Sequence, residues 1–217
     1  MIFVENRESF FSRLEPFFTP STLLNIELAY TLSKFGHRSQ FRKEVDDSGN
    51  KVRYFEHVRR AAIILVDEVK IVTRETVISC LLHDCIEDTK NINAAMIEHC
   101  FGQEVTSLVK TLSKVPEEGY LERFYMNTDW RAYLCKACDR LDNLRHLDQT
   151  TKEFRAKQIA ETKEKYYPLF DRMLQLTPPE YLARVSNIRD LIRSTTDYQE
   201  AAAKYQTDLV QPIPFNI

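Results

Sequence analysis

Apolar residues recur at helical spacing along nearly the whole chain. The clearest segment is 73–87, where a helix with about 100° per residue would be apolar over one half. The apolar positions there are Val77, Ile78, Leu81, Leu82 and Cys85. Similar patterns predict helices at 8–18, 21–35, 55–69, 92–100, 103–112, 121–147, 152–176 and 181–193, and the longest could break near 127–129. The pattern therefore predicts an all-α protein.

Three stretches lack this spacing. Residues 37–54, which contain the run Asp46-Asp47-Ser48-Gly49-Asn50, are predicted to be largely loop. Residues 116–120 are predicted to form a turn, and 211–215 an irregular tail. The chain has 217 residues, of which 43% are hydrophobic, and it shows no internal repeat or linker. We therefore expect a single domain over 1–217, a helical bundle of about eight to ten helices.

Composition excludes several classes of function. Only four glycines are present, which argues against glycine-rich phosphate loops and a dinucleotide fold. A formal net charge of −2 argues against a nucleic-acid polymer as a partner. No stretch approaches about 18 consecutive apolar residues, so we expect no membrane span.

The cysteine pattern points to a reducing compartment. The five cysteines are an odd number without the spacing of a disulfide framework, which favours the cytoplasm. Cys135 and Cys138 form one CxxC motif on an apolar helix face, and no second pair completes a four-cysteine zinc site. Two core cysteines are the favoured interpretation.

The candidate chemistry begins in the 73–87 helix and the residues that follow it. His83, Asp84 and Glu87 fall opposite the apolar half, and Asp88 lies at its border. His83 and Glu87 are i, i+4 neighbours, and so are Asp84 and Asp88. Such a face carries metal-type ligands and, one turn on, two acids able to move protons. A solvated polar face is the alternative, and both interpretations stay open for this segment alone.

A second acidic helix is predicted at 134–147. Its apolar stripe consists of Leu134, Ala137, Cys138, Leu141 and Leu144. Asp139 and Asn143 are i, i+4 neighbours beside the stripe, although a surface helix with ordinary ion pairs would explain Asp139 alone. Together with His57 and the pair His83–Asp84, however, Asp139 completes a set of two imidazoles and two carboxylates. That set suits a divalent metal that activates water against a phosphate ester.

Five blocks in order resemble a known family. They are Ala29-Tyr30 with Gly36-His37-Arg38-Ser39-Gln40-Phe41-Arg42-Lys43, Tyr54-Phe55-Glu56-His57, Leu81-Leu82-His83-Asp84-Cys85-Ile86-Glu87-Asp88-Thr89, Phe101-Gly102-Gln103-Glu104-Val105-Thr106-Ser107-Leu108-Val109, and Cys138-Asp139-Arg140-Leu141-Asp142-Asn143-Leu144. The chain is similar to the HD-type hydrolase domain of the RelA/SpoT homologues, and in particular to the stand-alone small alarmone hydrolases of the metazoan SpoT type. The resemblance covers roughly 25–170, which leaves 1–24 as a helical cap and 171–217 as a helical extension with an irregular tail.

The resemblance implies removal of the 3′-pyrophosphate from (p)ppGpp, the alarmone of the stringent response, giving GDP or GTP and pyrophosphate, with Mn²⁺. By motif, the metal ligands would be His57, His83, Asp84 and Asp139. Glu87 and Asp88 would position and deprotonate the attacking water. The substrate contacts would be Arg42, Lys43, Asn143 and, in a looser register, Tyr166.

The departures from the family pattern lie around the expected nucleotide pocket and leave the expected metal ligands unchanged. Val58 replaces a common proline, Asp142 replaces a common His or Tyr, and His146 stands where a small or acidic residue is commoner. Other substrates therefore stay open, namely NADPH in a 2′-phosphatase reaction or an adenine analogue such as (p)ppApp. A nucleotide-binding module without turnover is the alternative from another class. The terminal extensions could serve homodimer formation.

Overall fold

Helices make up most of the computed structural model, which describes residues 5–46 and 48–208. The α-helices are α1 (Arg7–Leu14), α2 (Pro20–Gly36), α3 (Tyr54–Ile63), α4 (Arg74–Leu82), α5 (Cys85–Asp88), α6 (Ala94–Phe101), α7 (Gln103–Leu112), α8 (Tyr120–Met126), α9 (Trp130–Arg145), α10 (Lys152–Glu161), α11 (Tyr167–Leu176) and α12 (Leu182–Asp208). The strands are β1 (Phe41–Val45) and β2 (Lys51–Arg53). If α5 is counted with α4, and α11 with α10, the described residues contain ten helical segments. The prediction of an all-α bundle of about eight to ten helices is confirmed.

Side-chain caps explain where many helices begin. Each capping side chain accepts a hydrogen bond from a backbone N–H of the first turn, which would otherwise lack a partner. The caps are Asn6 for α1, Thr19 for α2, Thr73 for α4, Asn93 for α6, Asp129 for α9 and Thr151 for α10. The start of α9 matters most for the site, because α9 carries Asp139 and Asn143.

Helix α9 forms the centre of the molecule. Residues 132–142 are all buried, and the helix packs against α3, α4, α7, α11 and α12. The predicted apolar stripe is confirmed, whereas the surface-helix alternative fails because charged residues such as Asp139 are enclosed as well. Cys135 and Cys138 are buried free thiols, as expected for core cysteines. One cluster of buried apolar side chains extends from Phe10 to Ile192.

The prediction that 37–54 is largely loop was wrong in part. Strands β1 and β2 form an antiparallel hairpin, with Phe41 opposite Arg53 and Val45 opposite Lys51. The side chain of Asp46 accepts from the backbone N–H groups of Ser48 and Asn50, which stabilises the connecting turn. The strands are short and mostly polar, so their sequence carries little of the apolar alternation that predicts a strand.

The predicted helix 73–87 is interrupted at the site. Helix α4 ends at Leu82, α5 begins at Cys85, and Asp84 has φ −100° and ψ 0°. The expected break near 127–129 is confirmed between α8 and α9. The last helix runs on to Asp208, beyond the predicted end at 193. The predicted tail 211–215 lies outside the described residues.

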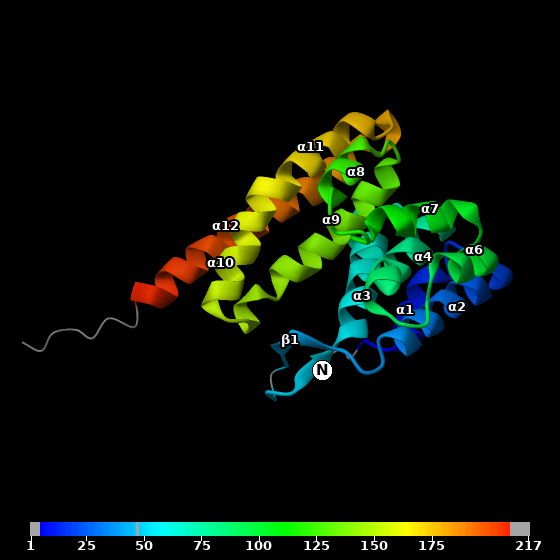
Figure 1. The fold of residues 1–217 in the computed structure, drawn as a ribbon, viewed down its shortest axis with the longest axis horizontal. Coiled ribbons are helices and arrows are strands. Elements are labelled where there is room, and N and C mark those ends of the chain that lie inside the picture. Colours follow the sequence, from blue (N-terminus) through cyan, green and yellow to red (C-terminus); the bar gives the residue numbers. More distant parts are fainter. Residues whose placement is uncertain (1–4, 47, 209–217) are drawn as a thin grey trace, which may run out of the picture.

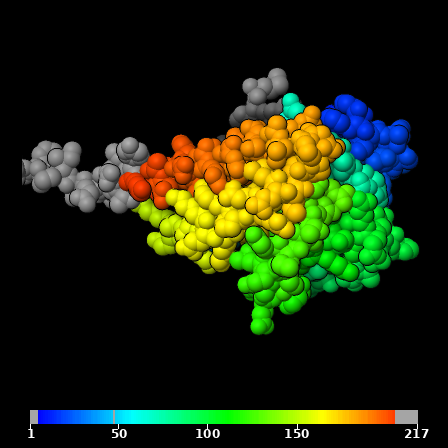
Figure 2. Space-filling model, turned by 90° about the horizontal axis from the view of Figure 1, so that it is seen from above, coloured from blue at the N-terminus to red at the C-terminus, as the bar shows by residue number. Residues whose placement is uncertain are grey.

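The elements fall into two groups in Figure 1, with α9 between them. Helices α1–α7 lie on one side, and the hairpin lies at their edge. Helices α10, α11 and α12 pack together on the other side, and Figure 2 shows α12 lying along this layer. In the described part of the chain, no helix has the length and apolar character needed to cross a membrane.

Candidate active site

Four candidate metal ligands converge from three distant parts of the chain. His57 belongs to α3, His83 and Asp84 lie between α4 and α5, and Asp139 belongs to α9. Nε2 of His57 lies 3.2 Å from Oδ1 of Asp139, and Nε2 of His83 lies 2.9 Å from Oδ2 of Asp84. Nε2 of His57 lies 3.9 Å from Oδ2 of Asp84, and Nε2 of His83 lies 3.8 Å from Oδ1 of Asp139. Metal–ligand bonds of about 2.1 Å place neighbouring ligand atoms roughly 3 Å apart and opposite ones about 4 Å apart. These four candidate ligands are called the metal centre below.

The imidazoles are oriented as metal ligands would be. Nδ1 of His83 donates to the carbonyl oxygen of Cys80 at 2.8 Å, and Nδ1 of His57 donates to Oδ2 of Asp142 at 2.6 Å. Both Nε2 atoms therefore face the shared space. Nε2 of His83 is buried and makes no hydrogen bond within the described residues, although a carboxylate oxygen of Asp84 is near. His57, His83 and Asp139 also form a compact metal-type cluster by distance alone. The residues fit a divalent metal.

Opposite charges lie close together in the metal centre and shift the pKa values of its residues. Burial by itself would lower the pKa of His83, but the charges of Asp84 and Asp139 outweigh it and raise that pKa to about 9. Burial would raise the pKa of Asp84, but the nearby charge of His83 holds it far below its ordinary range. The metal-free site thus holds ionised carboxylates, the form that binds metal, beside a protonated His83, whose proton a bound metal would displace.

The interruption of the helix at His83–Asp84 lets two consecutive side chains serve one site. Successive residues of a regular helix point about 100° apart. The backbone of Asp84 instead lies in the sparsely populated bridge region, where many active-site residues are found. Asp84 Oδ2 can therefore lie beside Nε2 of His83 rather than on a separate face.

The two predicted proton-handling acids have different partners. Both carboxylate oxygens of Glu87 accept hydrogen bonds from Lys114. Oε2 accepts from the backbone N–H of Lys114 at 3.0 Å, and Oε1 accepts from its Nζ at 3.2 Å. Oδ2 of Asp88 lies 3.1 Å from the hydroxyl of Tyr54, which is also 2.7 Å from Oδ2 of Asp84. Burial first, and then the charges of Asp84 and Glu87, raise the pKa of Asp88. Asp88 is thus joined to the metal centre by a shared hydroxyl.

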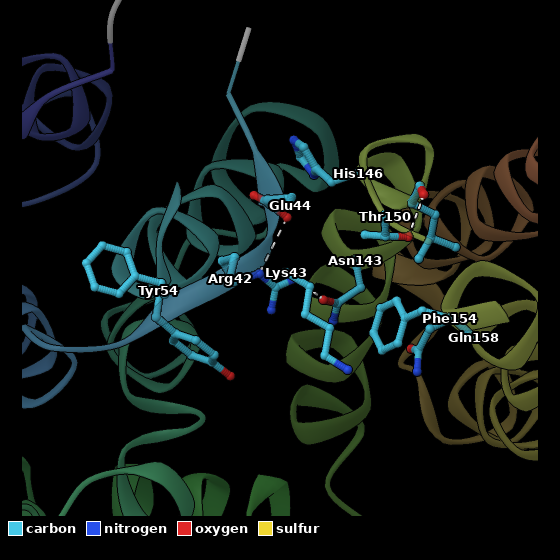
Figure 3. A pocket seen from close by; sticks show the side chains of 11 residues that line it. Arg42, Lys43, Glu44, Tyr54, Asn143, His146, Thr150, Phe154 and Gln158 are labelled. Atoms are coloured by element: carbon cyan, nitrogen blue, oxygen red, sulfur yellow. Dashed lines mark hydrogen bonds and ion pairs between the residues drawn. The ribbon is translucent and has the colours of Figure 1, made fainter. Parts of the chain in front are cut away.

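Three of the predicted substrate contacts share one pocket, drawn in Figure 3. Arg42, Lys43 and Asn143 line a cavity of about 200 Å³ together with Tyr54 and Phe154, and it is called the β1 pocket below. Arg42 donates to Oδ1 of Asn143 at 2.5 Å, and Nδ2 of Asn143 donates to Oδ1 of Asp139 at 2.6 Å. The β1 pocket is therefore connected to the metal centre. Nζ of Lys43 lies 4.0 Å from the centre of the Phe154 ring.

Tyr166 is the predicted contact that lies apart from the others. Its side chain is almost completely buried, and the guanidinium of Arg140 covers its ring at 3.8 Å. It lines a second hollow together with Lys114 and Lys165. The structure therefore brings Arg42, Lys43 and Asn143 together but separates Tyr166 from them.

Several residues that contact the site were not predicted from the sequence. Tyr54, Lys114 and Lys136 were not singled out, and Lys136 lies 2.7 Å from Oδ2 of Asp139. The sequence did contain a signal for Lys136, because it lies one helical turn before Asp139 in a helix that was predicted to pack in the core. Asp142 was predicted to lie beside the apolar stripe, as an i, i+4 neighbour of His146, but its contact with His57 was not predicted. The buried His37 stacks on Tyr54.

Comparisons with known proteins place the chain in a family. A family described as "HD domain" matches residues 37–173, which is more than half of the chain. The chain belongs to the HD domain family. The prediction of an HD hydrolase fold, made from five short blocks, is thereby confirmed, and the family together with the His–His–Asp cluster indicates a divalent metal.

Relatives of this HD domain carry RelA/SpoT-type names. It is 35% identical over 167 residues to a GTP pyrophosphokinase of Myxococcus xanthus, covering 68% of this chain and 20% of the relative. It is 32% identical over 163 residues to a guanosine-3′,5′-bis(diphosphate) 3′-pyrophosphohydrolase of Aquifex aeolicus, covering 71% and 22%. This HD domain thus spans about a fifth of the length of the curated relatives it matches.

A solved structure shares the fold. It is described as a metazoan orthologue of SpoT that hydrolyses ppGpp and plays a role in starvation responses. The match has a TM-score of 0.56 and 24% sequence identity, and it covers 76% of this chain and 93% of the other. The resemblance to the RelA/SpoT homologues is confirmed by these relatives and this fold.

Proposed function

We propose that this HD domain is a metal-dependent hydrolase that removes the 3′-pyrophosphate of (p)ppGpp, giving GDP or GTP and pyrophosphate. The observation that carries the proposal is the convergence of two imidazoles and two carboxylates beside a cationic pocket. The name of the Aquifex aeolicus relative supports this substrate. We take Mn²⁺ as the metal, since a mixed nitrogen and oxygen ligand set suits it.

In this proposal His57, His83, Asp84 and Asp139 hold the metal. A bound divalent metal lowers the pKa of water and neutralises charge on the phosphate. The protein orients its ligands through outer contacts: Cys80 through its carbonyl, Asp142 through its carboxylate and Tyr54 through its hydroxyl. Such contacts set the direction of each ligand atom.

Asp88 is the favoured acceptor for the proton of the attacking water. It shares the hydroxyl of Tyr54 with Asp84, so it lies within one hydrogen-bonded group of the metal centre. Both oxygens of Glu87 are engaged by Lys114, which suits a positioning role for Glu87. A carboxylate within hydrogen-bonding reach of the water meets the geometric requirement for a general base.

The β1 pocket would receive the nucleotide. Its cations, Arg42 and Lys43, match the negative charge of a substrate with two diphosphates. Phe154 and Tyr54 offer aromatic surfaces beside those cations, and Asn143 joins the pocket to Asp139. Tyr166 lies with Lys114 in the second hollow, and we propose a more peripheral substrate contact there.

A substrate panel tests the proposal. The purified protein is incubated with Mn²⁺ and, separately, ppGpp, ppApp and NADPH, and the products are separated by anion exchange. The proposal expects the fastest turnover with ppGpp. Faster release of orthophosphate from NADPH, or faster cleavage of ppApp, would overturn the substrate assignment. Tight ppGpp binding without turnover, unchanged by Glu87→Gln, would instead indicate a binding module.

Two further features belong to the proposal. We place the protein in the cytoplasm, and the free state of all five cysteines supports a reducing compartment. The division into a cap, a core over 25–170 and an extension, with a homodimer formed through the extensions, is tested by light scattering of the full chain and of a chain shortened to 25–170.

A further inference from the structure

Strand β1 is anchored to the body of the protein by a carboxylate. Among its five residues only Glu44 is buried, and its side chain is 2% exposed. The same strand carries Arg42 and Lys43, which line the β1 pocket. The position of these two cations therefore depends on what holds Glu44.

Glu44 is held by an arginine that also holds Asp142. One terminal nitrogen of Arg60 lies 2.5 Å from Oε1 of Glu44 and 3.2 Å from Oδ2 of Asp142. Nε of Arg60 donates to Oδ1 of Asp142 at 2.7 Å. The planar guanidinium thus joins two carboxylates, one on β1 and one on α9, in a fixed geometry.

Asp142 in turn holds a metal ligand. Its Oδ2 accepts from Nδ1 of His57 at 2.6 Å, and both side chains are 1% exposed. A carboxylate on the second imidazole nitrogen fixes the direction of the nitrogen that faces the metal. Glu44, Arg60, Asp142 and His57 therefore form an unbroken series of charged contacts from β1 to the metal centre.

We propose that Glu44, Arg60 and Asp142 are positioning residues that couple the placement of strand β1 to the orientation of His57. The inference rests on the proposed role of His57 as a metal ligand. None of the three is one of the four metal-centre residues. Glu44 nevertheless influences metal binding, and the same series sets Arg42 and Lys43 relative to the metal centre.

Metal titration of the full-length protein tests the coupling without any nucleotide. Mn²⁺ is titrated calorimetrically into the metal-free protein and its variants. Asp142→Asn weakens Mn²⁺ binding by about 10–100-fold, as expected for the loss of an outer partner of a metal-bound histidine. Glu44→Gln also weakens it, by roughly 3–10-fold, since removing an outer contact acts through the ligand it orients. The combined variant binds within about twofold of Asp142→Asn alone, because both changes act through one series.

The matched control is Glu68→Gln. This substitution removes an arginine–carboxylate pair between Glu68, in the helical turn that follows α3, and Arg145 of α9, with contacts of 2.5 and 2.8 Å. Glu68 is not a member of the proposed series. It leaves the Mn²⁺ affinity within about twofold of wild type, as expected for an independent site. Circular dichroism confirms that each variant is folded. Should Glu44→Gln fail to fold, Arg60→Lys replaces it, because an ammonium cannot form the same forked contacts.

Unchanged Mn²⁺ affinity in folded Glu44→Gln, or in Arg60→Lys, overturns the coupling. Additive losses in the combined variant overturn it as well. The proposed substrate fails by a separate result, namely normal Mn²⁺ binding without turnover of ppGpp. A wild-type protein that binds no Mn²⁺ would refute the metal centre and the coupling together.

Discussion

The ammonium group of Lys136 lies 2.7 Å from Oδ2 of Asp139, and both side chains are buried. Burial by itself would lower the pKa of Lys136, but the charge of Asp139 outweighs it and holds that pKa well above its ordinary value. Oδ1 of Asp139 is left to face the imidazoles of His57 and His83, at 3.2 and 3.8 Å. Lys136 thus engages one oxygen of Asp139, whereas the other faces the metal centre and also accepts a hydrogen bond from Nδ2 of Asn143.

Replacing Lys136 by methionine should destabilise the metal-free protein. Lys136→Met leaves a buried carboxylate without its ammonium partner, and breaking such a pair costs roughly 3 kcal/mol of unfolding free energy. Urea denaturation of the metal-free protein measures the loss. Lys165→Met is the control, because Lys165 is half exposed and pairs with Glu161 at 3.4 Å. That surface pair contributes less than about 0.5 kcal/mol. Equal effects of the two substitutions would refute the role given to Lys136.

Removing the hydroxyl of Tyr54 should slow turnover. The hydroxyl lies 2.7 Å from Asp84 and 3.1 Å from Asp88, so Tyr54→Phe frees both carboxylates. Hydrogen bonds to charged groups contribute about 1.5–3 kcal/mol, which corresponds to a fall in kcat of about tenfold or more. Steady-state kinetics with ppGpp measure it. Tyr30→Phe, in the core beside Arg59, should leave kcat unchanged. A kcat for Tyr54→Phe equal to that of wild type would show that the Tyr54 hydroxyl does not contribute to turnover.

The sequence placed His83 and Asp84 opposite the apolar half of one predicted helix, and Asp139 beside the apolar stripe of another. The family resemblance assigned these residues and His57 as metal ligands, and that assignment stays a prediction. The sequence did not predict the helix interruption at His83–Asp84, since the apolar positions continue in register through Cys85. Nor did it predict the contact between Tyr54 and Asp84, which lie 30 positions apart in the chain. Contacts of this kind depend on how α3 packs against α4, and periodicity within one segment contains no information on that packing. The hairpin was missed for a local reason, namely its short and polar strands.

The charge of Lys43 should affect substrate binding more than the chemical step. Lys43 lines the β1 pocket opposite Phe154 and contacts none of the metal-centre residues in the structure as described. Lys43→Gln removes one cation facing an anionic substrate, which should raise KM about tenfold with kcat nearly unchanged. A fall in kcat with unchanged KM would contradict this assignment. Unchanged Mn²⁺ affinity in the variant serves as the internal control.

Acid should reduce the contribution of Asp129 to stability. Asp129 caps α9 and pairs with Arg131. Burial would raise its pKa, but the hydrogen bonds from Arg131 hold it below the ordinary value of 3.8. The carboxylate therefore stabilises the folded state fully above pH 3.8, and this contribution is lost as the pH falls through the lower folded pKa.

The substitution Asp129→Ala tests that dependence. It should cost about 1 kcal/mol near pH 7, the usual loss for a helix cap. The difference from wild type should shrink below pH 3.8. Denaturant unfolding at several pH values measures both quantities. A difference that stays constant down to the acid-unfolding region would show that the charge of Asp129 contributes nothing.

Phosphorus NMR of ppGpp during incubation with the protein tests the central claim most directly. With Mn²⁺, the account predicts one pyrophosphate and one GDP for each ppGpp consumed. It predicts no reaction after chelation, and neither Mn²⁺ binding nor turnover in His83→Ala or Asp84→Ala. Absence of turnover by wild-type protein with Mn²⁺ bound, stepwise release of orthophosphate, or full activity in either variant would contradict the account.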